Sequence, residues 1–255
     1  MKRKVLYCSK GSWVQREEEI IEEAPLLVLL NGRRYCTLFR TPGEDEALLM
    51  GMCFTEGLIR ERGEVLSIKV REDVTEVWTK GQYRGGEERR DLAQVLDEIK
   101  RRSFTPHKPE GERIGIGRIR ECTRVMESSQ RLRRRTGASH AVMLFSYALE
   151  SISMAEDVGR HNAFDKAIGR ALMDGRLEDV FIATLSSRIS FETARKAAMV
   201  GVKILVGASK ATSMAVLLGE ELHMTIITVM KTGDVIVYSD PERLLSDPTR
   251  CGKGD

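Results

Sequence analysis

The stretch VFIATLSSRISFETARKAAMVGVKILV, residues 180–206, contains a short apolar run, a helical pattern and a second short apolar run. Residues 180–185 and 203–206 are rich in apolar and β-branched side chains, which is typical of buried strands. Residues 190–200 between them follow a helical pattern. A helix that joins two strands in this way returns the chain to the same end of the sheet, so the strands run parallel. This unit predicts an α/β fold.

The same alternation continues on both sides of this unit. Strands are expected at residues 140–145, 225–230 and 235–238, and further helices at residues 162–173 and 211–223. The order predicts a largely parallel sheet with crossover helices, closed by a hairpin. We therefore expect an α/β domain over residues 121–255.

The first half of the chain, residues 1–120, predicts a smaller β-rich α+β domain. Asn31 and Gly32 both tolerate positive φ and mark a β-hairpin near residues 26–39. Turn residues and acids at 41–46 precede an apolar helix at 47–54, and residues 91–99 predict another short helix. Two β-branched runs, at 65–70 and 74–79, are expected to pair with each other.

Residues 101–119 contain prolines and glycines among basic residues, which indicates a loop between the two domains. This segment is either a solvated connection or a mobile active-site loop. From residue 100 to residue 136 the chain has twelve basic and four acidic residues, although its overall net charge is only +3. Such a local concentration of positive charge can guide an anionic ligand.

Composition limits the classes of protein that fit. The 255 residues, 42% of them hydrophobic and 31% charged, are typical of a globular protein with one large core or two modest ones. No apolar run approaches the ~20 residues of a membrane span, and no signal-type stretch follows the first residues, so we expect a soluble cytoplasmic protein. The five cysteines, with no Cys-x-x-Cys among them, argue against a disulfide framework and a Cys-only zinc site.

Polar side chains gather where three of the predicted strands end. In open α/β sheets, ligands bind at the carboxyl ends of strands, where helix N-termini favour anions. The candidates lie at residues 156–161, 186–188 and 207–210, and at the start of the strand predicted at 140–145. They are His140, Arg160, His161, Ser187, Arg188, Ser209 and Lys210. Their cationic, imidazole and hydroxyl groups suit a phosphate or diphosphate, although His140 is equally well explained as a hydrogen-bonded structural histidine.

Other polar residues nearby have simpler structural explanations. Ser190 and Thr212 suit helix caps, and Asp165 with Lys166 suits a solvated helical face. The turn KTGD, residues 231–234, is either an ordinary hairpin turn or a contact loop with one cation and exposed amides.

Several common catalytic motifs are missing from the sequence. It contains no P-loop, no strand-borne Rossmann glycine motif and no zinc constellation of the nucleobase deaminases. The residues therefore give no motif support for nucleotide hydrolysis or Rossmann-type dinucleotide use, and we expect no metal of the protein's own.

The stretch EDVGRHNAFDK, residues 156–166, closely resembles the most characteristic motif of the formate dehydrogenase accessory protein family, the FdhD sulfurtransferases. Five further stretches resemble motifs of that family, in the family's order: FTEGLI (54–59), TGASHA (136–141), SSRISFE (186–192), AAMVG (197–201) and ATSMA (211–215). The resemblance covers residues 25–245.

This resemblance implies a cytoplasmic protein that takes sulfur from a cysteine desulfurase as a persulfide and passes it to the molybdenum cofactor of formate dehydrogenase. The cofactor is bis(molybdopterin guanine dinucleotide), whose diphosphates and guanines suit the predicted anion pocket. Members have a three-layer α/β domain similar in fold to the cytidine deaminases, without their zinc, and usually act as homodimers. By motif position, the family's cofactor-binding hairpin falls on Val229, Met230, Lys231, Thr232, Gly233 and Asp234.

The sequence departs from the family pattern in its cysteines. The family carries sulfur on a Cys-x-x-Cys in the loop between the two halves, where this chain has IGIG at residues 114–117. Cys122 is the nearest thiol, and it falls in the helix that follows, where a buried apolar role is the alternative to a catalytic one. A persulfide carrier needs an accessible thiol of low pKa, which the surrounding basic residues would favour.

Three functions remain open from the sequence. The first is a sulfurtransferase or sulfur carrier that uses Cys122 or another route. The second is a chaperone that binds the cofactor and delivers it to apo-formate dehydrogenase without transferring sulfur. The third is a nucleic-acid binder that uses the basic segment, and it ranks last because that segment offers one aromatic side chain, Phe104, for base stacking.

Overall fold

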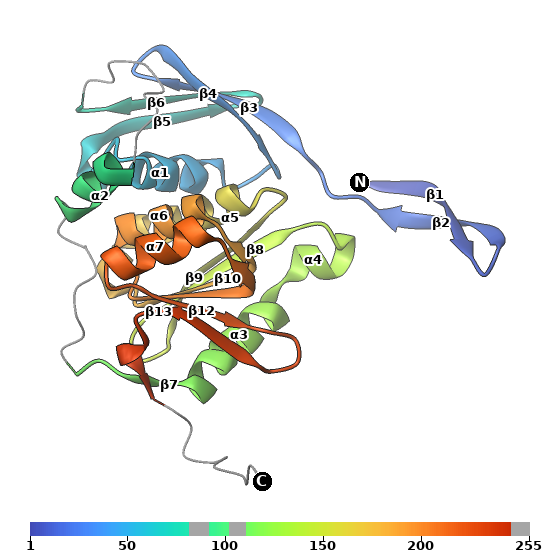
Figure 1. Cartoon of the computed structure of the whole chain (residues 1–255). Helices are drawn as coiled ribbons and strands as arrows, with labels where there is room; N and C mark the ends of the chain where they lie inside the picture. Colours follow the sequence, from blue (N-terminus) through green and yellow to red (C-terminus); the bar gives the residue numbers. More distant parts are fainter. Residues whose placement is uncertain (82–91, 102–110, 246–255) are drawn as a thin grey trace, which may run out of the picture.

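Two β-sheets are stacked with helices between them in the computed structural model, which describes residues 1–81, 92–101 and 111–245 (Figure 1). A small sheet lies at the top of Figure 1, a layer of helices lies beneath it, and a larger sheet follows with one long helix on its far face. No helix in these ranges is long and apolar enough to cross a membrane.

The small sheet has the strand order β4-β3-β6-β5. Its strands are β3 (Ala24–Leu30), β4 (Arg33–Arg40), β5 (Val65–Arg71) and β6 (Val74–Thr79), and α1 (Asp45–Thr55) covers one face. Asn31 and Gly32 have φ values of 50° and 77°, so the predicted hairpin turn is confirmed. The predicted helices are also present, as α1 and α2 (Leu92–Lys100), and β5 pairs antiparallel with β6 as expected.

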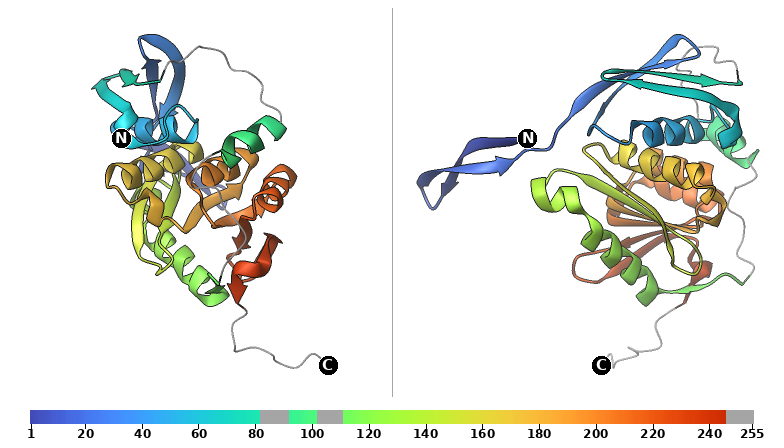
Figure 2. Two further views of the ribbon diagram at one scale, coloured as in Figure 1. Left: turned by 90° about the vertical axis from the view of Figure 1, so that its left-hand side faces the viewer. Right: turned by 180° about the vertical axis from the view of Figure 1, so that it is seen from behind.

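A separate hairpin precedes this sheet. Strands β1 (Lys2–Ser9) and β2 (Ser12–Glu19) pair antiparallel and project from the body of the molecule (Figures 1 and 2). We call residues 1–20 the arm.

The larger sheet has six strands in the order β13-β12-β11-β10-β8-β9. The strands are β8 (His140–Phe145), β9 (Ser151–Asp157), β10 (Ile182–Ile189), β11 (Ile204–Ala211), β12 (Thr225–Val229) and β13 (Val235–Ser239). Helices α5 (Arg160–Met173), α6 (Phe191–Val200) and α7 (Ser213–Glu221) cover one face, and α3 (Ile116–Ser129) covers the other. Short helical segments complete the chain: α4 (Arg131–Thr136), η1 (Arg62–Glu64), η2 (Leu177–Asp179) and η3 (Pro241–Arg243).

The prediction of a largely parallel sheet is correct only for its centre. Strand β11 runs parallel to β10 and β12, and β13 pairs antiparallel with β12, which confirms the predicted closing hairpin. In contrast, β8 pairs antiparallel with both β9 and β10. The difference arises from β9, which the sequence did not predict. This edge strand has the sequence SISMAED, in which polar residues interrupt the apolar ones, so it lacks the continuous apolar run of a buried parallel strand.

Helices α1 and α5 cross at two glycines. A Cβ atom added to Gly51 would lie 1.8 Å from the backbone oxygen of Asp165, and one added to Gly169 would lie 1.8 Å from the backbone oxygen of Ala47. The two backbones therefore approach as closely as the absence of side chains allows. This contact joins the small sheet and the α/β layers in one continuous hydrophobic core.

The segment predicted to be a loop, residues 101–119, is regular at its end. Ile114–Gly115 form β7, which pairs parallel with β14 (Leu244–Leu245), and α3 begins at Ile116. The domain boundary expected at residue 120 thus falls inside a helix. Ile114 and Ile119 are buried beneath the large sheet, so apolar burial overrides the loop signal of the neighbouring glycines. Residues 102–110 lie outside the described ranges.

Candidate functional site

One edge of the six-stranded sheet collects the predicted binding residues. The parallel strands β10, β11 and β12 all end there, and the antiparallel strand β8 begins there. Strand β9 ends there too, because His140 pairs with Asp157. Figure 1 shows this edge on the right of the large sheet, together with the turn between β12 and β13. We call the set His140, Arg160, His161, Ser187, Arg188, Ser209, Lys210 and residues 229–234 the polar edge.

Four of these residues lie in strands rather than in loops. Strand β10 continues through Ser187 and Arg188, and β11 continues through Ser209 and Lys210. The register between the two strands shifts after Leu185, so their last residues form an irregular extension of the sheet. Ser187 is buried and donates a hydrogen bond to the carbonyl of Arg188, whereas the other three residues are exposed.

Three helices begin at the polar edge. Ser190 is the N-cap of α6 in a capping box with Thr193, so its predicted capping role is confirmed. In the reciprocal half of the box, the backbone N–H of Ser190 donates to Thr193 Oγ1 at 2.9 Å. Helix α5 begins after Gly159, and α7 begins after Thr212, whose side chain makes no capping hydrogen bond in the described part of the chain. Among the described residues no side chain caps the first backbone N–H groups of α5 and α7, so these groups can bind an anion.

Some of the buried polar atoms that lack a hydrogen-bond partner among the described residues lie at this place, and others, on Thr75, Glu112 and Gln130, lie elsewhere. His140 Nδ1, Arg160 Nε and Thr212 Oγ1 are buried and have no hydrogen-bond partner among the described residues. Burying such atoms costs free energy unless they are paired, so each is explained by a ligand or by ordered water. Two of the three are residues that the sequence predicts to bind.

The two histidines of the polar edge are neutral at pH 7. The pKa of His161 is lowered to about 4, mainly by burial and also by the nearby cations Arg160 and Lys196, which outweigh the surrounding carboxylates. Burial also lowers the pKa of His140, with Arg133 and Arg160 acting in the same direction. A neutral imidazole offers one hydrogen-bond donor and one acceptor, so these residues can bind polar groups without adding charge. The positive charge of the edge comes from its arginines and lysines.

The turn between β12 and β13 is held from two sides. Within it, the N–H of Met230 donates to the carbonyl of Asp234 at 2.8 Å, and Gly233 adopts a φ of 88°. From outside, Arg120 of α3 donates from Nε to the Gly233 carbonyl at 3.0 Å. The Lys231 side chain is exposed at the tip. The sequence did not single out Arg120, whose only signal is its place in the basic segment.

The characteristic motif at residues 156–166 also has a structural role. Lys166 Nζ lies 2.7 Å from Asp157 Oδ2, and both side chains are almost fully buried. Asp157 also accepts hydrogen bonds from the N–H of Gly159 at 2.9 Å and from Nδ2 of Asn162 at 3.0 Å. Thr41 joins this network, since Lys166 donates to its carbonyl at 2.8 Å. The network fixes the start of α5 and ties it to the end of β4.

A second buried network lies where α1 ends against α5 and α6. Lys196 Nζ lies 2.9 Å from both carboxylate oxygens of Asp165, from Glu56 Oε1 and from Thr55 Oγ1. Arg195 donates to the same Glu56 oxygen at 2.7 Å. The interpretation of Asp165 and Lys166 as a solvated helical face is therefore wrong. Both side chains are buried, and each forms an ion pair with a residue of another element, Asp165 with Lys196 and Lys166 with Asp157.

Cys122 lies in α3 and is only 2% exposed. Burial raises the pKa of its thiol to about 11, so the thiolate that a persulfide carrier needs is scarce at neutral pH. Cys53 is buried as well, Cys36 is partly buried and Cys8 is exposed on the arm. Cys251 lies outside the described ranges.

A separate cleft of about 520 Å³ lies next to the polar edge. It is bounded by residues 41–44, by the junction of α3 and α4, by β9 and by Lys166 and Arg170 of α5. Most of its cations are already paired: Arg170 with Glu44, Lys166 with Asp157 and Arg135 with Glu19. Within the described ranges, none of the predicted binding residues lines this cleft.

The amino-acid sequence matches one protein family and its curated members. The model of the FdhD/NarQ family matches residues 21–245. The sulfur carrier protein FdhD of Streptomyces avermitilis is 31% identical, over 95% of both chains. The protein of the same name from Bacillus subtilis is 29% identical, over 95% of this chain and 96% of the relative.

A solved structure has the same fold. It comes from Desulfotalea psychrophila and is described as a formate dehydrogenase accessory protein. It superimposes with a TM-score of 0.78 and covers 96% of this chain and 99% of its own, at 22% sequence identity. At that identity the likeness concerns the mixed α/β fold alone.

Proposed function

Because the chain belongs to the FdhD/NarQ family, we propose that it acts as an accessory protein in maturing the molybdenum cofactor of formate dehydrogenase, and that the polar edge holds that cofactor as cargo. The cargo would be bis(molybdopterin guanine dinucleotide), an anion with diphosphate groups and guanines. The observation that carries the proposal is a set of buried atoms, on His140, Arg160 and Thr212, that have no hydrogen-bond partner in the described part of the chain and lie beside the uncapped N-termini of α5 and α7.

The polar edge offers the groups that this cargo requires. Arg160, Arg188, Lys210 and Lys231 would neutralise phosphate charge, and the first N–H groups of α5 and α7 would donate to phosphate oxygens. Neutral His140 and His161, with the hydroxyls of Ser187 and Ser209, would donate to and accept from the remaining polar groups.

The dimensions of the edge support an extended ligand. The cations are spread from the end of β12 to the end of β9, which is four strand spacings. At about 4.8 Å between neighbouring strands, this distance is roughly 19 Å. One phosphate would occupy a fraction of that width, whereas a dinucleotide would extend along it. The turn at residues 229–234 would close one end of the site.

GDP, as a fragment of the cargo, tests the site. Isothermal titration of the wild-type protein should give saturable binding, and Arg160→Ala and Lys231→Ala should each raise the Kd by about tenfold or more, because each removes a charge-assisted hydrogen bond. Arg34→Ala is the matched control, since Arg34 is an exposed arginine of β4 in the small sheet. Wild-type protein without affinity at millimolar GDP, or an equal loss in Arg34→Ala, would contradict the proposal.

Sulfur carriage is a second candidate activity, favoured by the names of the relatives. We infer that Cys122 does not carry the sulfur, because its thiol is buried and of raised pKa. The protein should be incubated with a cysteine desulfurase and cysteine, and the mass gain of one sulfur atom measured on wild type and Cys122→Ala. Cys122→Ala should show the same mass gain as wild type, even if that gain is zero. A gain on wild type that disappears in Cys122→Ala would overturn this inference.

The remaining parts of the proposal come from the family. A cysteine desulfurase and apo-formate dehydrogenase would be the partners, and the cytoplasm the location. The helix and sheet layers around β8–β13 would correspond to the cytidine deaminase fold. Delivery of cofactor without sulfur transfer is the alternative if no thiol of the protein accepts sulfur.

A further inference from the structure

The turn at residues 229–234 has little packing of its own. Its base is apolar, because Val229 belongs to the hydrophobic cluster on the α3 side of the large sheet. Its tip, residues 231–234, is exposed. The turn is closed by its own hydrogen bonds, with the Gly233 N–H donating to the Met230 carbonyl at 2.8 Å. Segments with few buried contacts open locally at small cost, so contacts from outside the turn decide how firmly its tip is fixed.

The outside contact is made by Arg120 of α3. Its Nε donates to the Gly233 carbonyl at 3.0 Å. In the described part of the chain, no other side chain from outside the turn forms a hydrogen bond with residues 230–234. In Figure 1, α3 runs beside the hairpin of β12 and β13. The guanidinium is a charged donor, so this hydrogen bond is stronger than one between two neutral groups.

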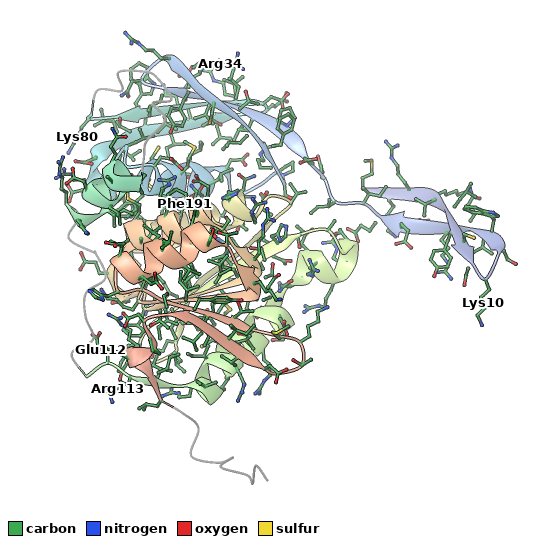
Figure 3. All side chains as sticks on the ribbon, viewed as in Figure 1. Lys10, Arg34, Lys80, Glu112, Arg113 and Phe191 are labelled. Carbon is green, nitrogen blue, oxygen red and sulfur yellow. The ribbon has the colours of Figure 1, made fainter. Side chains whose placement is uncertain are left out.

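Arg120 comes from a firmly held element. The preceding residue, Ile119, is fully buried in the same cluster as Val229. The start of α3 is also fixed, because β7 lies directly before it and pairs with β14. Figure 3 shows Glu112 and Arg113 at the lower left, where the chain enters β7 and α3. A side chain carried by a packed helix holds its partner more precisely than one carried by a loop.

The contact fixes one peptide group of the turn. The Gly233 carbonyl and the Asp234 N–H belong to the same planar trans peptide group and point in opposite directions. Because Arg120 holds the carbonyl, the Asp234 N–H points away from the guanidinium. There it lies 3.4 Å from Thr232 Oγ1, which is longer than an ordinary N–H···O hydrogen bond. The orientation of one carbonyl therefore sets the geometry of polar groups at the tip.

We propose that Arg120 is a positioning residue of the polar edge, which holds the turn at residues 230–234 in the conformation that receives the ligand. This inference rests on the proposed function, because it assigns the held turn to the same ligand. Removing the Arg120 side chain leaves Lys231 and Arg160 in place but lets the tip adopt other conformations. Ligand binding must then order the tip as well, and the affinity falls.

Hydrogen–deuterium exchange without ligand tests whether Arg120 holds the turn. Arg120→Ala should speed exchange of the Met230 and Gly233 N–H groups by about fivefold or more, because the turn loses a charge-assisted hydrogen bond. Exchange in β10 and β11 should stay as in wild type, since no core side chain is removed. The matched control is Arg124→Ala, which removes an exposed arginine one turn further along α3. Equal exchange of the turn in the two variants would overturn the proposal.

Isothermal titration with GDP tests whether the held turn serves the ligand. Arg120→Ala should raise the Kd by about fivefold or more, whereas Arg124→Ala should stay within about twofold of wild type. The ratio of the Arg120→Ala and wild-type Kd values should be the same at about 0.05 M and about 0.3 M salt, because positioning is not screened. A ratio that falls to one at high salt would show a long-range charge effect and overturn the positioning role.

The two proposals fail in different ways. Wild-type protein that does not bind GDP would contradict the proposed function, and the exchange of the turn would still decide whether Arg120 holds it. Wild-type protein that binds GDP, with Arg120→Ala binding as tightly as Arg124→Ala, would leave the proposed function standing and overturn the role of Arg120.

Discussion

Replacing Glu56 by glutamine removes a negative charge shared by two buried cations. Glu56 Oε1 accepts hydrogen bonds from Lys196 Nζ at 2.9 Å and from Arg195 Nη2 at 2.7 Å. Burial by itself would raise the pKa of Glu56, but the two cations outweigh it and lower the pKa from 4.5 to about 2. The folded protein therefore binds this proton more weakly than the unfolded chain does.

The sign and size of the effect follow from this difference. A carboxyl group whose pKa is lowered on folding stabilises the protein above pH 4.5, and the stabilisation is lost as the pH falls toward 2. The difference corresponds to about 3 kcal/mol at pH 7. At pH 3 about 1 kcal/mol remains, because the unfolded chain is already protonated while folded Glu56 is still ionised.

Urea denaturation at pH 7 and pH 3 measures the prediction. Glu56→Gln should lower the free energy of unfolding by about 3 kcal/mol at pH 7 and by about 1 kcal/mol at pH 3. Glu192→Gln is the control, because Glu192 also contacts Arg195, at 3.3 Å, but is half exposed. Its cost should stay below about 1 kcal/mol at both pH values. An equal cost of Glu56→Gln at the two pH values would refute the electrostatic account.

Three further predictions concern other parts of the molecule. Gly51→Ala should lower the free energy of unfolding by about 1–3 kcal/mol, because its Cβ would lie 1.8 Å from a backbone oxygen. Gly63→Ala should change it little, because its Cβ would lie 3.5 Å from the nearest atom, a side-chain oxygen of Glu61, and equal melting temperatures of the two variants would contradict the close crossing. Lys166→Met should cost about 3–5 kcal/mol in urea denaturation, because Asp157 keeps a buried charge without its cation, and a cost below about 1 kcal/mol would count against that. For GDP, the Kd of His161→Gln divided by the Kd of wild type should be the same at pH 6 and pH 8, because a pKa of about 4 leaves His161 neutral at both. A ratio that rises toward pH 6 would show that the imidazole is charged there.

The sequence predicts the local features of the fold well. The Asn31-Gly32 hairpin, α1 and α5 each depend on signals within a few residues, such as turn chemistry or helical periodicity. The position of the polar edge was also predictable, because the carboxyl ends of neighbouring parallel strands meet at one edge. The inclusion of His140 there depends on the antiparallel pairing of β8 with β10.

The features that sequence patterns missed depend on contacts between distant segments. Asp165 and Lys166 look like a solvated pair locally, and they are buried because Lys196 and Asp157 meet them from other elements. Ile114 belongs to a strand because it pairs with β14 near the other end of the chain, and this pairing could not be predicted from the local sequence. In the same way, Arg120 gains its role by contacting the turn at Gly233, 113 residues later in the sequence.

Hydrogen–deuterium exchange with and without GDP tests the central claim most directly, because it locates the ligand as well as detecting it. We predict that GDP slows exchange at the first backbone N–H groups of α5 and α7 and in the turn at residues 230–234, because these segments form the polar edge. Slower exchange confined to residues 41–44 and the junction of α3 and α4 would place the ligand in the neighbouring cleft. That result, or no change at all, would contradict the assignment of the polar edge as the cofactor site.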